Sequence, residues 1–204
     1  MNRSKIQLAI IAFITAIILA VFVGIRFASP NTDLMEQIGN RAIQECQKNG
    51  VALSIGSKQT SGLVIKTLTF YDVVAEFNPF YLTFSSISAT PSITAMTSNA
   101  IDGKLSARHV TLELPFLGAI HFGNGSAHVR IDEEDNTFVR DFKFSGACNV
   151  KGHFTITKDS KFTDYRFVFT PKKEQQALFT TLATLGTPLR KISDDQWLLE
   201  SEPK

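Results

Sequence analysis

The sequence predicts a mainly β protein in which a single N-terminal transmembrane helix precedes an antiparallel β-sheet with two short amphipathic helices. Three observations support this fold class. They are a charge-free run of twenty residues near the N-terminus, apolar residues at every second position in most of the remaining chain, and two segments with helical spacing. The 204 residues, 44% of them hydrophobic, suffice for one anchored domain. A multi-domain enzyme is therefore not expected.

The charge of the chain is distributed unevenly. The total is +2, but Arg3, Lys5 and Arg26 flank the apolar run, and from residue 27 onward 18 basic residues stand against 19 acidic ones. The part of the chain beyond the run therefore carries a charge of −1, which excludes a strongly basic nucleic-acid-binding protein. No nucleic acid is expected as a partner.

The apolar run at residues 6–25 has the length of a transmembrane helix. At the helical rise its twenty residues span roughly 30 Å, the thickness of the hydrocarbon core of a bilayer. The alternative, a cleaved signal peptide, has an apolar region of about 7 to 15 residues and small residues before the cleavage site. Here cleavage after Ala28 or Ser29 would place Arg26 or Phe27 where a small residue is needed. We therefore predict an anchor that is not cleaved.

The basic residues around the run predict its orientation. Arg3 and Lys5 precede it, whereas Arg26 alone follows it closely. Because cytoplasmic flanks carry the excess of positive charge, residues 1–5 are expected in the cytoplasm. The bulk of the chain then lies outside the cytoplasm, and in a bacterium this places a single-pass protein of the inner membrane with its C-terminal domain in the periplasm.

Cys46 and Cys148 are the two cysteines of the sequence. In an oxidising compartment they form one disulfide that closes a loop of 103 residues. Such a bridge contributes up to about 4 to 5 kcal/mol on the chain-entropy model. Alternatively both are buried thiols that pack as small apolar side chains. Their spacing matches no metal site and no redox motif.

Residues 26–50 are predicted to be a linker and an amphipathic helix. Asn31 or Thr32 is a suitable N-cap, and Asn49-Gly50 ends the helix. Apolar residues follow the cap at helical spacing, namely Leu34, Met35, Ile38, Ala42 and Cys46.

Residues 51–204 are predicted to be an antiparallel β domain. Alternating apolar residues run from Leu63 to Asn78-Pro79, and a second run continues from Phe80 to Pro91. Further alternating runs cover residues 110–114, 127–131, 142–144, 150–156 and 165–169. Turn signals lie between the runs at Asp102-Gly103, Pro115, Gly123-Asn124-Gly125, residues 133–136, Gly146 and residues 158–161. Strands without helical segments between them predict a meander with one apolar, strongly aromatic face.

A second helix is predicted near residues 171–186. Thr170-Pro171 supplies an N-cap and a first turn, and Gly186 and Pro188 end the helix. Its apolar stripe consists of Ala177, Leu178, Leu182 and Leu185. Residues 196–200 are predicted to be a short final strand, with Trp197 and Leu199 on one side.

The sequence contains no recognisable catalytic or metal-binding motif. The acidic residues 132–135 lack the spacing of a calcium loop and are interpreted as a solvated hairpin tip. There is no nucleophile elbow, P-loop or dinucleotide fingerprint. The histidines fall at outward positions or near turns, and none lies within four residues of another: His109, His121, His128 and His153. We therefore expect no enzymatic activity, no metal and no cofactor.

The aromatic face is the feature of the sequence that suggests a function. Many of the seventeen phenylalanines recur at every second position in the strands between Phe70 and Phe169, and an apolar face of this size must be covered. Either the sheet curls and buries its own face, or the face is an open groove that holds acyl chains or a partner strand. The candidate groove consists of Phe142, Phe144, Phe154, Ile156, Tyr165, Phe167 and Phe169.

Several segments resemble a known family. They are the stretch YLTFSSISATPSI at residues 81–93, the strands at 142–146 and 150–157, and the passage from Phe169-Thr170-Pro171 into a helix that ends near residues 182–188. Together with the anchor, these segments resemble the type II secretion system protein N family, which is related to the AsmA-like envelope proteins. The resemblance covers most of the chain in layout, although the chain is somewhat short for the family. It implies a curved sheet, a half-pipe or open barrel, with an apolar inner face.

The resemblance implies a non-enzymatic accessory component of a secretion machinery in the inner membrane. The first hypothesis is an interaction protein that binds other envelope or secretion-system proteins through its sheet edges and helices. The second hypothesis is a protein that handles lipid or lipopolysaccharide and holds acyl chains on the aromatic face.

Overall fold

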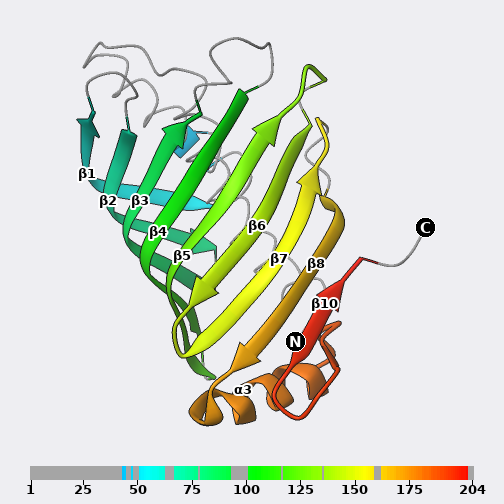
Figure 1. Ribbon diagram of the computed structural model, residues 1–204. Helices are drawn as coiled ribbons and strands as arrows, with labels where there is room; N and C mark the ends of the chain where they lie inside the picture. The colour runs from blue at the N-terminus through cyan, green and yellow to red at the C-terminus, as the bar shows by residue number, and fades with distance from the viewer. Residues whose placement is uncertain are drawn as a thin grey trace.

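The structure, a computed structural model, describes residues 43–44, 47, 51–62, 67–77, 79–92, 101–115, 117–134, 136–158 and 162–201. In these residues the chain is mainly β, as predicted: one open, antiparallel sheet of ten strands with a helix, α3, at one end (Figure 1). The strands lie in the order β1-β2-β3-β4-β5-β6-β7-β8-β10-β9. From β1 to β8 each strand therefore pairs with its neighbour along the chain, which confirms the predicted meander.

The strands lengthen toward the middle of the sheet and shorten at its C-terminal edge. Their bounds are β1 Ala52–Ser61, β2 Thr67–Phe77, β3 Phe80–Pro91, β4 Ile101–Leu114, β5 Gly118–Ile131, β6 Thr137–Ser145, β7 Cys148–Ile156, β8 Phe162–Pro171, β9 Arg190–Lys191 and β10 Trp197–Glu200. The helix α3 covers Lys173–Thr184. The predicted turns at Pro115, residues 133–136 and Gly146 all lie between strands.

The two faces of the sheet differ in chemistry. One face, the inner face, consists of buried apolar side chains contributed by every strand from β1 to β8 and by β10. Among the most completely buried are Phe70, Leu82, Phe84 and Phe154. The opposite, outer face carries the polar and charged side chains. The alternation of apolar and polar residues thus sorts the side chains as the sequence predicts.

The alternation changes phase partway along several strands. In β6 both Val139 and Phe142 are buried, although residues three apart point to opposite faces of a regular strand. The register between β6 and β7 shifts between these two residues, so β6 contains one extra residue, a β-bulge. Bulges bend strands and increase their twist, and the sheet is strongly curved (Figure 1).

Left-handed backbone conformations mark these bulges. The residues Asp72, His109, Asp141 and Asp164 have φ of 48–50°, and the last three lie at register shifts with a neighbouring strand. Asp and His tolerate this region better than most residues that carry a side chain.

Two predicted turns are instead parts of strands. Gly123-Asn124-Gly125 lies inside β5, where Gly123 has φ 69° and Asn124 Oδ1 accepts a hydrogen bond of 3.1 Å from the backbone N–H of His109. The segment that was predicted to be a turn therefore forms the bulge between β4 and β5. Asp102-Gly103 lies inside β4, because Gly103 pairs with Pro91 of β3 and with Val129 of β5, and Asp102 pairs with Arg130 of β5.

The helix begins later than predicted. Thr170 and Pro171 still pair with β7, so Lys172 is the N-cap and makes no side-chain capping bond. The end is as predicted: Gly186 has φ 83°, and its N–H donates to the carbonyl of Ala183 at 3.1 Å.

The packed stripe of the helix overlaps the predicted one at Leu182, which is buried, and at Leu178, which packs against the core, whereas Ala177 is exposed. The buried residues of the helix are Phe179 and Leu182, whereas Leu185 is 40% exposed. On the same helix, the Gln175 side-chain amide donates to the carbonyl of Ala119 at 2.9 Å and so ties α3 to β5. The helix is thereby fixed at the end of the sheet (Figure 1).

The strands β1 and β9 were not predicted, whereas β10 matches the predicted final strand. Of the predicted helix within residues 26–50, only Ile43, Gln44 and Gln47 are described, and all three are helical. The predicted span at residues 6–25, its flanks Arg3, Lys5 and Arg26, and residues 1–5 lie outside the described residues. Within the described ranges, no helix combines the length and the hydropathy needed to cross a membrane.

Candidate functional site

The predicted aromatic residues form one continuous row of rings on the inner face. Ring centroids are 5.0 Å apart for Phe142 and Phe144, 5.5 Å for Phe142 and Phe167, and 5.8 Å for Phe154 and Phe167. Phe169 continues the row at 6.4 Å from Phe167. These five side chains are 2–9% exposed and belong to the hydrophobic core. We call this row the aromatic ladder.

The remaining two residues of the predicted groove lie at the margin of the ladder. Ile156 and Tyr165 are partly buried and pack against the core, and the Tyr165 ring stacks on Phe167 at 6.5 Å. The structure therefore brings all seven predicted residues onto one face. An open groove for acyl chains stays a prediction.

Glycines make room for the ladder. Gly152 on β7 pairs with Phe142 on one side and Phe167 on the other, so these two rings meet across a position without a side chain. A Cβ at Gly152 would collide with the carbonyl oxygen of Arg166 and lie 2.7 Å from the Phe167 ring. Gly125 plays the same role beneath the ring of Phe144.

Three further aromatic residues extend the ladder beyond the predicted set. Phe122 lies 6.3 Å from Phe144 at one end, and Phe179 of α3 and Trp197 of β10 continue the ladder from Phe169. Phe179 lies three residues before Leu182, so its helical spacing could have identified it as part of the buried stripe of the helix. Phe122 immediately precedes the Gly123 bulge, which hides its place in the alternation.

The two edges of the sheet differ in length and charge. Among the described residues, β1 pairs only with β2 and leaves the other side of a ten-residue strand unpaired. Lys58 is the one charged residue of β1, and the strand contains no proline. The other edge, β9, consists of Arg190 and Lys191 alone. Short, charged edges resist strand addition, whereas a long and nearly uncharged edge is a template for it.

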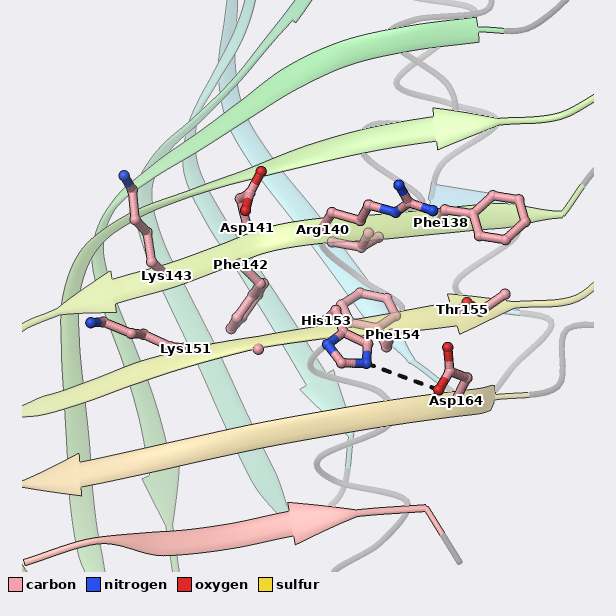
Figure 2. A pocket seen from close by; sticks show the side chains of 12 residues that line it. Phe138, Arg140, Asp141, Phe142, Lys143, Lys151, His153, Phe154, Thr155 and Asp164 are labelled. Carbon is pink, nitrogen blue, oxygen red and sulfur yellow. Dashed lines mark ion pairs between the residues drawn. The ribbon is translucent and has the colours of Figure 1, made fainter. Parts of the chain in front are cut away.

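The outer face carries a hollow of about 860 Å³ over β6, β7 and β8 (Figure 2). Its charged or ionisable lining residues are Arg140, Asp141, Lys143, Lys151, His153 and Asp164. This hollow was not predicted from the sequence, because its lining depends on which residues of neighbouring strands stand opposite each other.

All four histidines lie on the exposed outer face, as predicted. His109 Nδ1 is 2.9 Å from the Ser85 hydroxyl, His121 Nδ1 is 3.1 Å from the Thr111 hydroxyl, and His153 lies 3.9 Å from Asp164. His128 contacts Asp102. Within the described part of the chain, no three His, Cys, Asp or Glu side chains gather as metal ligands would.

The acidic turn between β5 and β6 is organised by Asp132. Its carboxylate accepts hydrogen bonds from the backbone N–H groups of Glu134 at 3.0 Å and Asn136 at 2.8 Å, and from the Asn136 amide at 3.1 Å. Burial acts to raise the pKa of Asp132, but the hydrogen bonds from Asn136 and Glu134 outweigh it and hold the pKa below its ordinary value. Asp132 therefore stabilises the turn.

Cys148 is a buried thiol at the start of β7. Burial raises its pKa from 9.0 to about 12, although a backbone hydrogen bond involving Thr170 acts in the opposite direction. Cys46 lies outside the described residues, so the disulfide between Cys46 and Cys148 stays a prediction.

Comparison with known proteins gives one family. The model of the family described as "Type II secretion system protein GspN-like, Synergistales" matches residues 8–201. The match covers nearly the whole chain and confirms the resemblance seen in the sequence. No curated protein and no solved structure matches the chain.

Proposed function

Since the chain belongs to the GspN-like family of type II secretion system proteins, we propose that it is a non-enzymatic accessory component of the secretion machinery. A single N-terminal span holds it in the bacterial inner membrane, and its β-sheet lies in the periplasm as a scaffold for contacts with other secretion-system proteins. The span is supported by the length and composition of residues 6–25.

The open edge of β1 is the observation that carries the scaffold role. A partner segment in extended conformation adds to such an edge through main-chain hydrogen bonds, which is a common mode of protein recognition. The edge is ten residues long and nearly uncharged, whereas the two-residue edge at β9 is short and basic. The sheet therefore favours partner binding at β1.

Proline substitutions along β1 test this role. Adjacent residues of a strand direct their N–H groups to opposite sides, so of Ser57→Pro and Lys58→Pro, one removes a hydrogen bond to β2 and the other removes an outward donor. The outward variant should keep its melting temperature and lose co-purification with the other secretion components. Arg190→Pro at the opposite edge is the control and should retain the partners. A wild-type chain that purifies from its host in mild detergent as an isolated monomer would contradict the proposal.

The aromatic ladder favours a second candidate function, the handling of lipid or lipopolysaccharide. A continuous row of phenylalanines is a surface on which acyl chains can lie, provided the face opens. Native mass spectrometry of the chain extracted from its own membrane tests this function. Bound lipid supports it, and a spectrum of the lipid-free protein alone eliminates it.

A further inference from the structure

The hollow on the outer face owes its shape to two bulges. Asp141 on β6 and Asp164 on β8 have φ of 49° and 48°, and the pairing of both strands with β7 shifts beside them. Bulges bend the bulged strand away from a flat sheet, so the surface of β7 lies between two bends. A volume of about 860 Å³ is within the range of small-molecule sites.

Two lysines stand directly opposite each other at one end of this hollow. Lys143 of β6 pairs with Lys151 of β7, and both side chains are exposed. Residues directly opposite in an antiparallel pair have Cβ atoms about 4.5–5.5 Å apart, and like charges in this arrangement are destabilising. Figure 2 shows both lysines at the same end of the hollow, with Arg140 toward the other end.

The positive charge of the hollow is only partly compensated. Within the described residues no carboxylate lies within 4.0 Å of the charged nitrogens of Lys143, Lys151 or Arg140, and Asp164 instead faces His153 at 3.9 Å. The hollow lies in a wider basic region. The basic residues of β4 to β8 are Lys104, Arg108, Arg130, Arg140, Lys143, Lys151 and Arg166, against the acidic Asp102, Glu113, Asp141 and Asp164.

We propose that this hollow binds a phosphate group, carried either by a small soluble molecule or by a lipid headgroup. A phosphate presents several acceptor oxygens in a tetrahedral arrangement, so one group can accept hydrogen bonds from Lys143 and Lys151 together and remove their mutual repulsion. Arg140, toward the other end of the hollow, adds a further positive charge that attracts the same anion. A concave site of this volume fits one phosphate group and part of the molecule that carries it. It is too small for the broad acidic surface of a protein.

Calorimetric titration of the full chain in a non-ionic detergent tests the proposal. The soluble arm uses glycerol 3-phosphate, and the lipid arm uses micelles that contain phosphatidylglycerol, with phosphatidylcholine as the zwitterionic comparison. The double variant Lys143→Gln, Lys151→Gln should bind about tenfold more weakly in the arm that binds the wild type, because both charge-assisted bonds are lost. Lys172→Gln with Lys173→Gln, two exposed lysines beside the start of α3, removes the same charge elsewhere and should change the affinity by less than about twofold.

The two arms identify the source of the phosphate, and binding in either arm supports the site. Absence of binding in both arms, an equal loss in the control variant, or tighter binding of polyglutamate than of the phosphate compounds would overturn the proposal. Unchanged melting of the double variant, followed by Trp197 fluorescence, confirms that its fold is intact. Neither the inner-membrane location nor the secretion partners enter this test, so its outcome is independent of the proposed scaffold role.

Discussion

Replacement of Phe142 by alanine removes the central ring of the aromatic ladder. Phe142 is 3% exposed, and its ring centroid lies 5.0, 5.5 and 6.2 Å from those of Phe144, Phe167 and Phe154. The variant loses the transfer free energy of the ring and leaves a cavity between strands that cannot fully collapse. We therefore expect the free energy of unfolding to fall by about 3–5 kcal/mol.

The single tryptophan of the chain provides the assay. Trp197 is 6% exposed, and its ring lies 6.4 Å from Phe179 at the far end of the same ladder. Urea unfolding of the full chain in a neutral detergent, followed by Trp197 fluorescence, should give a lower midpoint with an unchanged slope. In thermal unfolding the same loss corresponds to a decrease in Tm of roughly 6–20 °C.

A second phenylalanine of β6 is a matched control. Phe138 is half-buried, whereas Phe142 is 3% exposed, so Phe138→Ala should cost only about 1 kcal/mol. Equal losses in the two variants would refute the assignment of Phe142 to the packed inner face. So would a loss below about 1 kcal/mol for Phe142→Ala, because an open groove leaves a ring of this kind largely solvated.

Three other predictions concern the ladder, the buried thiol and the membrane anchor. Gly152→Ala should lower the urea midpoint by the equivalent of about 1–3 kcal/mol, because the new methyl group collides with the Arg166 carbonyl; an unchanged midpoint would show that the strands are further apart. In a Cys46→Ser chain, the rate at which iodoacetamide alkylates native Cys148 should keep rising from pH 8 to pH 10, because its pKa is raised to about 12, whereas the rate for the unfolded chain should level off above pH 9. Fast labelling of the native thiol at pH 7 would contradict its burial. Deletion of residues 6–25 should release the chain from the membrane fraction, and alkaline phosphatase fused after residue 204 should be active on the full chain; an inactive fusion would reverse the predicted orientation.

The sequence predicted the strands whose alternation is uninterrupted. Phe142 and Phe144, with Lys143 between them, have the period of two that a half-buried strand requires, and β6 is found there. The strand β1 was missed because its alternation is short: Val51, Leu53 and Ile55 alternate, but the residues after Ile55 are all polar, apart from Gly56. From Ser57 to Ser61 the pairing with β2 is maintained by backbone hydrogen bonds, for which these polar side chains give no periodic signal.

Turns predicted from local composition were wrong where contacts with a neighbouring strand determine the backbone conformation. Gly123-Asn124-Gly125 has the composition of a turn, yet Asn124 is held by the N–H of His109 in the adjacent strand, and the segment continues as β5. The predicted start of the helix was wrong for the same reason. Thr170 is a good N-cap in isolation, but in the structure it remains paired with Asn149 of β7. In both cases a long-range contact overrides a local preference that is worth about 1 kcal/mol.

A spacing of three between buried apolar residues inside a strand was the overlooked signal for the bulges. It occurs at Ala107 and Val110 and at Val139 and Phe142, where the register shifts and the residue at positive φ is His109 or Asp141. A regular strand would turn one member of each pair toward the solvent, which would expose a large apolar surface. The extra residue costs backbone strain at a left-handed Asp or His but keeps both members of the pair buried, and burial of a Val or Phe side chain contributes about 1.5–3 kcal/mol.

The same extra residue links the two faces of the sheet. With the bulge at Asp141, Phe142 pairs with Gly152 and its ring meets Phe167 across the glycine, while Lys143 pairs with Lys151 on the other side. A register shifted by one residue would place Phe142 opposite Lys151, so that an apolar and a charged side chain faced the same side.

The packing of the aromatic ladder thus fixes the register that sets the two lysines against each other. The opposed lysines are therefore maintained by the inner face, whose loss of packing would cost far more than the repulsion of two exposed ammonium groups. Because the fold imposes this excess of positive charge on the outer face, an anion that occupies the hollow stabilises an arrangement that already exists, with no rearrangement of the sheet.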